Sequence, residues 1–165
     1  MNIRTYACAG AAVLTVLGAS AVLAQGSAQT QTPAASSRYV IKGGEVYDKK
    51  TDLTWMRCSV GQTWKDGVGC VGVIRTMTFD EANRGWTNGW RMPTVDELTT
   101  LIVPGQIPSI DQVAFPDMDF LGPLWYWTST ERGASVACLV NFSVGRVFDN
   151  NRAGAHAVRL VRGVQ

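Results

Sequence analysis

The chain has 165 residues, of which 46% are hydrophobic and 17% are charged, and its formal net charge at pH 7 is +2. This length suits a single domain with a hydrophobic core of its own. The near balance of charge argues against a nucleic-acid-binding protein, because such proteins concentrate basic residues.

The N-terminal region begins with Arg4, followed by an apolar run over residues 7–24 that ends in the small-residue pattern Val22-Leu23-Ala24. This arrangement predicts a secretory signal peptide over residues 1–24, and hence no membrane segment after its cleavage. The alternative is an uncleaved membrane anchor, since the run is nearly long enough to span a bilayer.

The following tract, residues 25–37, consists mainly of Gln, Ser, Thr and Ala and contains nothing that could form a core. It predicts a flexible tether, because its burial could not offset the entropy of ordering. The folded domain is expected over residues 38–165, in the periplasm or outside the cell.

The cysteines of this domain are Cys58, Cys70 and Cys138. Cys58 and Cys70 flank a glycine-rich loop, residues 59–69, and an oxidising compartment favours a disulfide between them. Closing such a loop contributes about 3 kcal/mol in the chain-entropy model. A zinc site is the weaker alternative, because the chain has one histidine. Cys138 is interpreted as a small buried hydrophobe, with a reactive thiol as the alternative.

The first strands of the domain are expected at residues 39–41 and 45–47, where Gly43-Gly44 gives a hairpin signal. Residues 53–56 alternate in polarity and predict a third strand. The domain therefore opens with antiparallel sheet.

Two short helices are predicted by capping boxes, in which a threonine and a glutamate three residues later satisfy each other's backbone N–H groups. The first pair is Thr78 with Glu81, and the second is Thr94 with Glu97. The segment before the second helix, Trp90-Arg91-Met92-Pro93-Thr94, is interpreted as a structural motif that includes Glu97. Arg91 is expected to contact nearby carbonyls or a carboxylate; contact of Arg91, Asp96 or Glu97 with a ligand is the alternative.

Residues 103–122 are expected to form a long ordered loop, and such loops commonly carry function. Strands are expected at 125–130, at 136–142 and 146–148 as a hairpin, and at 157–161. Together these elements predict an α+β fold. Trp55, Trp90 and Trp127 are assigned to the core, although an aromatic ligand platform would also use such residues.

Several motifs in this order resemble the family named after the C-terminal domain of the Legionella collagen-like adhesin. They are Leu53-Thr54-Trp55-Met56-Arg57-Cys58, Trp64 and Cys70, Gly89-Trp90-Arg91-Met92-Pro93-Thr94 with Glu97-Leu98, Tyr126-Trp127-Thr128-Ser129-Thr130, and Val158-Arg159-Leu160-Val161-Arg162-Gly163. The resemblance implies an adhesin-like module. The adhesin's own domain is associated with binding sulfated glycans and with trimerisation, but it follows a collagen-like repeat. This chain has no Gly-X-Y repeat, so the resemblance carries over neither the trimer nor the ligand. The Arg-x-Pro-Thr-x-x-Glu core is also similar to the formylglycine-generating, sulfatase-modifying family, which implies a C-type lectin-like fold.

Candidate ligand-binding residues are expected in the loops that flank the last strands. They are Trp125, Glu131, Arg132, Arg146, Asp149, Asn150, Asn151 and Arg152. Carboxylates and amides bind paired sugar hydroxyls, an aromatic ring covers the apolar side of a sugar, and guanidinium groups bind sulfate or carboxylate. These residues predict an acidic or sulfated glycan as ligand, with an envelope protein as the alternative partner. A simple turn at residues 149–151 is the competing interpretation.

Catalysis and metal binding have less support. Formylglycine-generating enzymes use two reactive cysteines late in the domain, where this chain has only Cys138. His156 is interpreted as a strand-edge residue rather than a catalytic base. The aspartates that could bind calcium do not follow an EF-hand spacing. The sequence therefore predicts a non-catalytic module with no cofactor and no metal.

Overall fold

The computed structural model describes residues 37–118 and 122–163. The predicted signal peptide, and the predicted tether except Ser37, lie outside the described residues. Among the described residues, no helix is long and apolar enough to cross a membrane.

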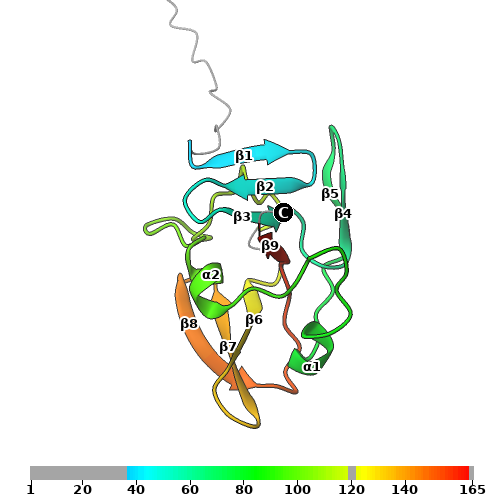
Figure 1. Ribbon diagram of the computed structural model, residues 1–165. Coiled ribbons are helices and arrows are strands. Elements are labelled where there is room, and N and C mark those ends of the chain that lie inside the picture. The colour runs from blue at the N-terminus through cyan, green and yellow to red at the C-terminus, as the bar shows by residue number, and fades with distance from the viewer. Residues whose placement is uncertain (1–36, 119–121, 164–165) are drawn as a thin grey trace, which may run out of the picture. The chain divides into compact units, whose positions relative to one another are not determined.

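A four-stranded antiparallel sheet joins the two ends of the domain (Figure 1). Its strands, in spatial order, are β1 (Tyr39–Lys42), β2 (Glu45–Asp48), β3 (Leu53–Met56) and β9 (Val161–Gly163). The predicted first three strands are confirmed. The last strand begins later than predicted, because Ala157 forms only an isolated bridge, with Tyr126.

The β4 (Gln62–Lys65) and β5 (Gly69–Gly72) strands form a separate two-stranded hairpin. The prediction of a loop for this region is wrong. Gly61 and Gly67 lie in turns with positive φ, whereas Gly69 and Gly72 are the end residues of β5, so the residues on either side of the Gly67 turn pair as strands. The predicted Cys58–Cys70 disulfide is confirmed, with the two Cα atoms 5.5 Å apart. It fastens β5 to the segment that follows β3.

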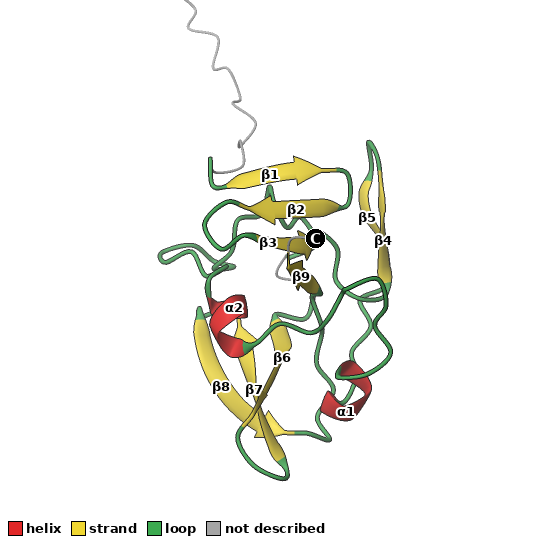
Figure 2. Cartoon of the chain, viewed as in Figure 1, coloured by secondary structure: helices red, strands yellow, loops and turns green. Residues whose placement is uncertain are grey.

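Both predicted capping boxes are present. Helix α1 (Phe79–Ala82) follows Thr78, and α2 (Val95–Thr99) follows Thr94. In α2, the Thr94 hydroxyl accepts from the Glu97 N–H at 3.2 Å, and the Glu97 carboxylate accepts from the Thr94 N–H at 2.8 Å. The predicted α+β fold is therefore confirmed (Figure 2).

A second antiparallel sheet consists of β6 (Trp125–Glu131), β7 (Val136–Asn141) and β8 (Arg146–Asn151), in that spatial order. Residues of β7 are almost all buried, whereas those of β8 are mostly exposed. The strand β8 is longer than the predicted 146–148, so Asp149, Asn150 and Asn151 lie in a strand and the turn interpretation of these residues is wrong.

Two hydrophobic clusters cover the two faces of this sheet. Tyr126 and Val140 are opposite each other and belong to the first cluster, which also contains Leu98 and Leu101 from the α2 region. Trp127 and Leu139 are the next opposite pair and belong to the second cluster, with Phe79 of α1. Trp55 and Trp127 are fully buried, as predicted, while Trp90 is half-buried against the second cluster.

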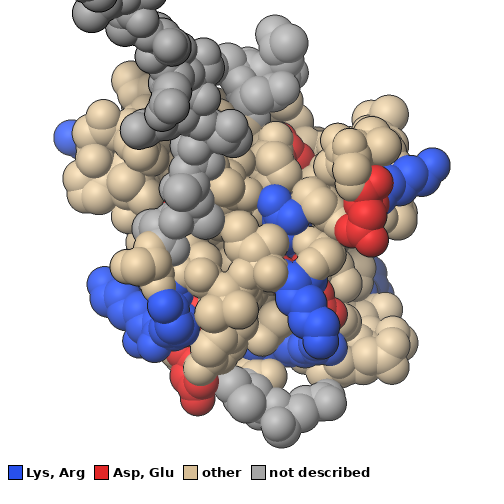
Figure 3. Space-filling model, turned by 90° about the horizontal axis from the view of Figure 1, so that it is seen from above, with Lys and Arg blue, Asp and Glu red and all other residues tan. Residues whose placement is uncertain are grey.

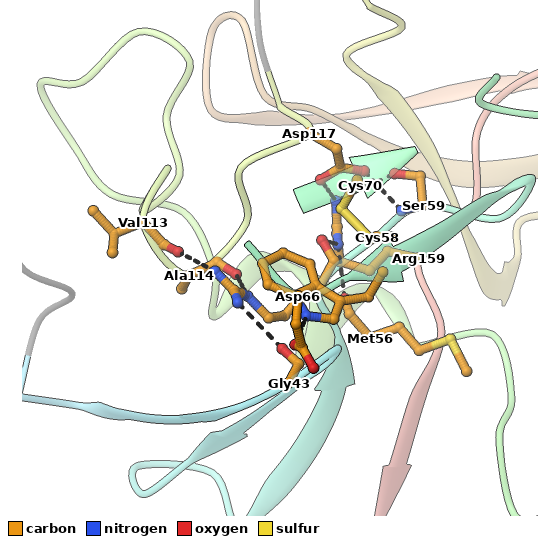
Figure 4. Close-up of a disulfide and its surroundings, with 12 residues drawn as sticks. Gly43, Met56, Cys58, Ser59, Asp66, Cys70, Val113, Ala114, Asp117 and Arg159 are labelled. Atoms are coloured by element: carbon orange, nitrogen blue, oxygen red, sulfur yellow. Dashed lines mark hydrogen bonds and ion pairs between the residues drawn. A yellow bond between two sulfur atoms is a disulfide. The ribbon is translucent and has the colours of Figure 1, made fainter. Parts of the chain in front are cut away.

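A buried ion pair links the long loop to the C-terminal segment (Figure 4). The guanidinium of Arg159 donates to Asp117 Oδ1 at 2.5 Å, to the Arg57 carbonyl at 2.5 Å and to the Met56 carbonyl at 2.7 Å. Both side chains of the pair are fully buried. Asp117 also accepts the Ser59 N–H at 2.7 Å, so this pair positions the backbone beside the disulfide.

Candidate functional site

The exposed aromatic residues of the second sheet gather on one of its faces. Trp125 and Phe148 are 37% and 39% exposed, and their ring centroids are 5.1 Å apart. The ring of His156 lies 6.3 Å from that of Trp125 and 4.8 Å from that of the buried Trp127. Trp127, Leu139 and Phe148 are opposite one another across three strands, which places them on the same face.

Asn150 adds an amide to this face. Its side-chain oxygen accepts the Asn151 N–H at 2.7 Å, so its amide nitrogen points to His156 Nε2, 2.9 Å away. Burial lowers the pKa of His156 below its ordinary value of 6.5, which favours the neutral ring. A neutral ring with Nε2 as acceptor matches donation from the Asn150 amide.

Arg146 is the cationic residue of β8. It shares a face with Phe148 and Asn150, two and four positions later in the strand. Among the residues that the structure describes, no carboxylate lies within ion-pair distance of Arg146. We call Trp125, Arg146, Phe148, Asn150 and His156 the aromatic face.

Two of the predicted ligand residues lie on the opposite side of the sheet. Asp149 is opposite Cys138, and Arg132 donates to the Cys138 sulfur at 3.0 Å and lies 3.6 Å from the Asp149 carboxylate. Cys138 is buried, as predicted, but it contacts these polar groups as well as apolar ones. Burial raises the pKa of its thiol.

The other predicted residues lie near α1, at the end of the sheet. Arg152 is bonded to Asp80, lies 3.5 Å from the Glu131 carboxylate and covers the Phe79 ring at 4.5 Å. Its charge is therefore neutralised within the protein. A pocket of about 520 Å³ is lined here by Asp80, Asn151 and Arg152 among others. The eight predicted residues thus separate into three places, and only Trp125, Arg146 and Asn150 lie on the aromatic face.

The expectation that these eight residues lie in loops is corrected by the strand assignments. Trp125 and Glu131 are the end residues of β6, and Arg146, Asp149, Asn150 and Asn151 belong to β8. Only Arg132 and Arg152 follow strand ends. Because successive strand residues point to opposite faces, a continuous run such as 149–151 cannot form one contact surface.

The Trp90-to-Thr94 motif forms structural contacts. The Arg91 guanidinium donates two hydrogen bonds to the Glu97 carboxylate, at 2.7 and 2.6 Å, and Pro93 is buried. The ring of Trp90 lies 4.5 Å from the Arg162 guanidinium. Arg91 holds the pKa of Glu97 below its usual range, so the pair remains ionised at neutral pH.

A cleft of about 650 Å³ lies beside β8. It is lined by residues of the segment 102–109 and of the hairpin turn at 143–145, and Ile102, Ile107, Val144 and Phe148 supply apolar walls. Within the described ranges, no group of three or more His, Cys, Asp or Glu residues could hold a metal ion.

Sequence reasoning missed Phe148 and His156 as members of the aromatic face. The alternation of Arg146, Phe148 and Asn150 was the available signal for Phe148, but it requires knowing that β8 continues to Asn151. His156 reaches the face through its antiparallel bridge with Met77, a long-range contact that no local pattern encodes.

The chain matches a known protein family over most of its length. The family model described as the Lcl C-terminal domain matches residues 44–162. No curated protein matches the chain. The matched region runs from the β1–β2 turn into β9 and includes both helices, the disulfide and the aromatic face.

Proposed function

The protein belongs to the Lcl C-terminal domain family, and from this membership and the aromatic face we propose that it is an exported, adhesin-like, non-catalytic module that binds glycans. The observation that carries the proposal is the exposed pair of rings, Trp125 and Phe148, on a sheet whose other large aromatics are buried. An exposed aromatic pair beside an amide and a guanidinium suits a sugar ring and its hydroxyl or acidic groups.

Export is supported by the disulfide, because disulfides persist in oxidising compartments. The predicted signal peptide agrees with this location. The lectin-like fold suggested from the sequence remains part of the proposal; it is supported by the pairing of β3 with β9, which brings the two ends of the domain together.

An acidic or sulfated glycan is the proposed ligand, since Arg146 is free to pair with an anion. Nucleic acid is not proposed. On the face shown in Figure 3, lysine and arginine side chains lie in separate groups with acidic side chains nearby, rather than in one continuous basic surface.

The non-catalytic assignment is supported by the surroundings of Cys138 and His156, the two residues considered as a reactive thiol and a catalytic base. Cys138 is buried with a raised pKa, which disfavours the reactive thiolate. The Nε2 atom of His156 is hydrogen-bonded to the Asn150 amide and is therefore already engaged. Titration with copper, followed by absorbance, tests this assignment: stoichiometric tight binding would contradict it.

The binding proposal is tested by comparing Trp125→Ala with Trp64→Ala, a control at a half-buried tryptophan on the β4–β5 hairpin. Heparin and neutral oligosaccharides serve as probes on an array and in calorimetry. We expect Trp125→Ala to weaken binding at least about tenfold, as is common for an exposed aromatic anchor. The proposal fails if the parent protein binds no glycan, or if both variants bind as the parent does.

A further inference from the structure

The strand β8 is an open edge of the second sheet. It pairs with β7 from Arg146 to Asn151 without an irregularity. In the part of the chain that the structure describes, no backbone hydrogen bond joins Arg146–Asn150 to any segment except β7. The N–H and C=O groups on the outer side of β8 are therefore available to another strand. In Figures 1 and 2, β8 is the outermost strand of its sheet.

Of the features that usually block such an edge, β8 has two charged side chains, Arg146 and Asp149, but it lacks the others. The strand contains neither lysine nor proline, and the irregularity in this sheet lies between β6 and β7. The charge of Asp149 is matched by Arg132. Val147 and Phe148, on opposite faces of β8, are each 39% exposed, so an added strand would cover apolar surface on both faces.

The cleft beside β8 provides space for side chains of such a strand. Ile107 and Val144 are 65% and 56% exposed on its walls, and Phe148 connects the cleft to the strand. This apolar surface is open to solvent, and the cleft volume of about 650 Å³ is enough for more than one side chain.

The positive charge of Arg146 indicates that the added strand carries an acidic side chain. Arg146 lines the cleft and begins β8, and within the described residues it has no carboxylate partner. Arg132 and Arg152, by contrast, have partners within the domain. Among the described residues that line the cleft, none is acidic. A carboxylate on the incoming segment would complement Arg146.

We propose that β8 and the adjacent cleft bind an extended peptide segment of a partner protein, which adds a fourth strand to the sheet. Backbone hydrogen bonds to β8 supply affinity, apolar side chains at alternate positions enter the cleft, and an acidic side chain pairs with Arg146. This site shares Arg146 and Phe148 with the aromatic face, but it goes beyond glycan binding because it uses the outer backbone of β8 and the cleft rather than the exposed ring of Trp125.

The test uses an eight-residue peptide of alternating valine and threonine with a glutamate near its centre. Two matched peptides carry glutamine in place of glutamate, or N-methyl groups on alternate backbone amides. We expect the first peptide to bind the purified protein with a Kd on the order of 10–100 µM. The glutamine peptide should bind up to about fivefold more weakly, as for an exposed ion pair, and the N-methylated peptide should not bind.

Two protein variants locate the binding site. Val147→Lys places a charge on the β8 edge, and Val40→Lys places the same charge on β1, the outer strand of the other sheet, where Val40 is 49% exposed. Val147→Lys should weaken peptide binding at least about tenfold, while Val40→Lys should leave it unchanged. Amide chemical shifts should change in β8 and around residues 102–109.

Other outcomes overturn the proposal. They include no binding of the parent peptide at about 1 mM, equal binding of the N-methylated peptide, or an effect of Val40→Lys alone. Sedimentation provides a further check: if the protein is a dimer that Val147→Lys dissociates, the edge is occupied by a second copy of the chain and the proposal is wrong. Trp125→Ala, which tests glycan binding, should leave peptide binding unchanged, so either proposal can fail alone.

Discussion

The buried Arg159–Asp117 pair should be the most sensitive polar contact in the domain. We consider Asp117→Asn, which keeps the shape of the side chain and removes its charge. The guanidinium of Arg159 would remain fully buried without a counter-charge. The new amide would also direct a donor either at Arg159 or at the Ser59 N–H, because the two Asp117 oxygens accept from these two donors.

The expected loss follows from these contacts. Removing one partner of a buried ion pair costs about 3–5 kcal/mol, because the other charge stays buried. The free energy of unfolding of a domain is typically about 5–15 kcal/mol, so this loss is a large fraction of the total. The three hydrogen bonds from Arg159 to Met56, Arg57 and Ser59 do not replace the lost charge, since their acceptors are neutral.

Urea denaturation followed by tryptophan fluorescence measures the loss. Asp149→Asn is the matched control, because the Arg132–Asp149 pair is 3.6 Å long with both side chains more than half exposed, and should change stability by less than about 1 kcal/mol. The double variant Asp117→Leu with Arg159→Met should lose less stability than Asp117→Leu alone, because no uncompensated charge remains. An Asp117→Asn protein as stable as the Asp149→Asn protein would refute this reasoning.

Three further predictions concern pH, the disulfide and the Arg91 motif. Burial lowers the pKa of His156 in the folded protein, so on acidification the unfolded chain binds a proton at this residue before the folded protein does. The free energy of unfolding should therefore fall as the pH drops below 6.5. His156→Gln should reduce this dependence between pH 8 and 5, and an unchanged dependence would show that burial of His156 does not cause it. Replacing Cys58 and Cys70 together by serine should cost about 3 kcal/mol in denaturant, and a double variant as stable as the parent would show that the cross-link adds nothing. Arg91→Ala should lower the melting temperature and leave glycan binding intact, because Arg91 is engaged by Glu97; lost binding at an unchanged melting temperature would place the site at Arg91.

Local signals in the sequence predicted the elements that are locally determined. Each capping box, at Thr78 and at Thr94, is a signal of four consecutive residues that specifies where a helix starts. The Gly43-Gly44 turn specifies the first hairpin in the same local way. The disulfide was predictable from the cysteine positions together with the expected compartment. The β4–β5 hairpin was missed because its glycine content conceals two short strands. The disulfide and Arg57, whose guanidinium lies 3.8 Å from the Trp64 ring, join this hairpin to the rest of the domain.

The candidate site was predictable only in part. Of the predicted residues, Trp125, Arg146 and Asn150 lie together on the aromatic face, but grouping residues by nearness in sequence joined both faces of β8 into one surface. Two ion pairs connect segments that are distant in the sequence: Arg152 with Asp80, and the buried Arg159 with Asp117. Such contacts follow from the tertiary fold and leave no periodic signal in the chain.

The pairing of β3 with β9 determines when the domain can finish folding. β3 ends at Met56 and β9 begins at Val161, so the edge of β3 stays open until all the elements between them have been made. Val161 also exchanges two backbone hydrogen bonds with Arg91, so the same late segment secures the entry to α2. A chain that emerges progressively during synthesis therefore cannot complete this sheet until β9 has emerged. Such delayed closure favours one cooperative folding step over stable partial structures, and it slows folding because the contacts are distant in sequence.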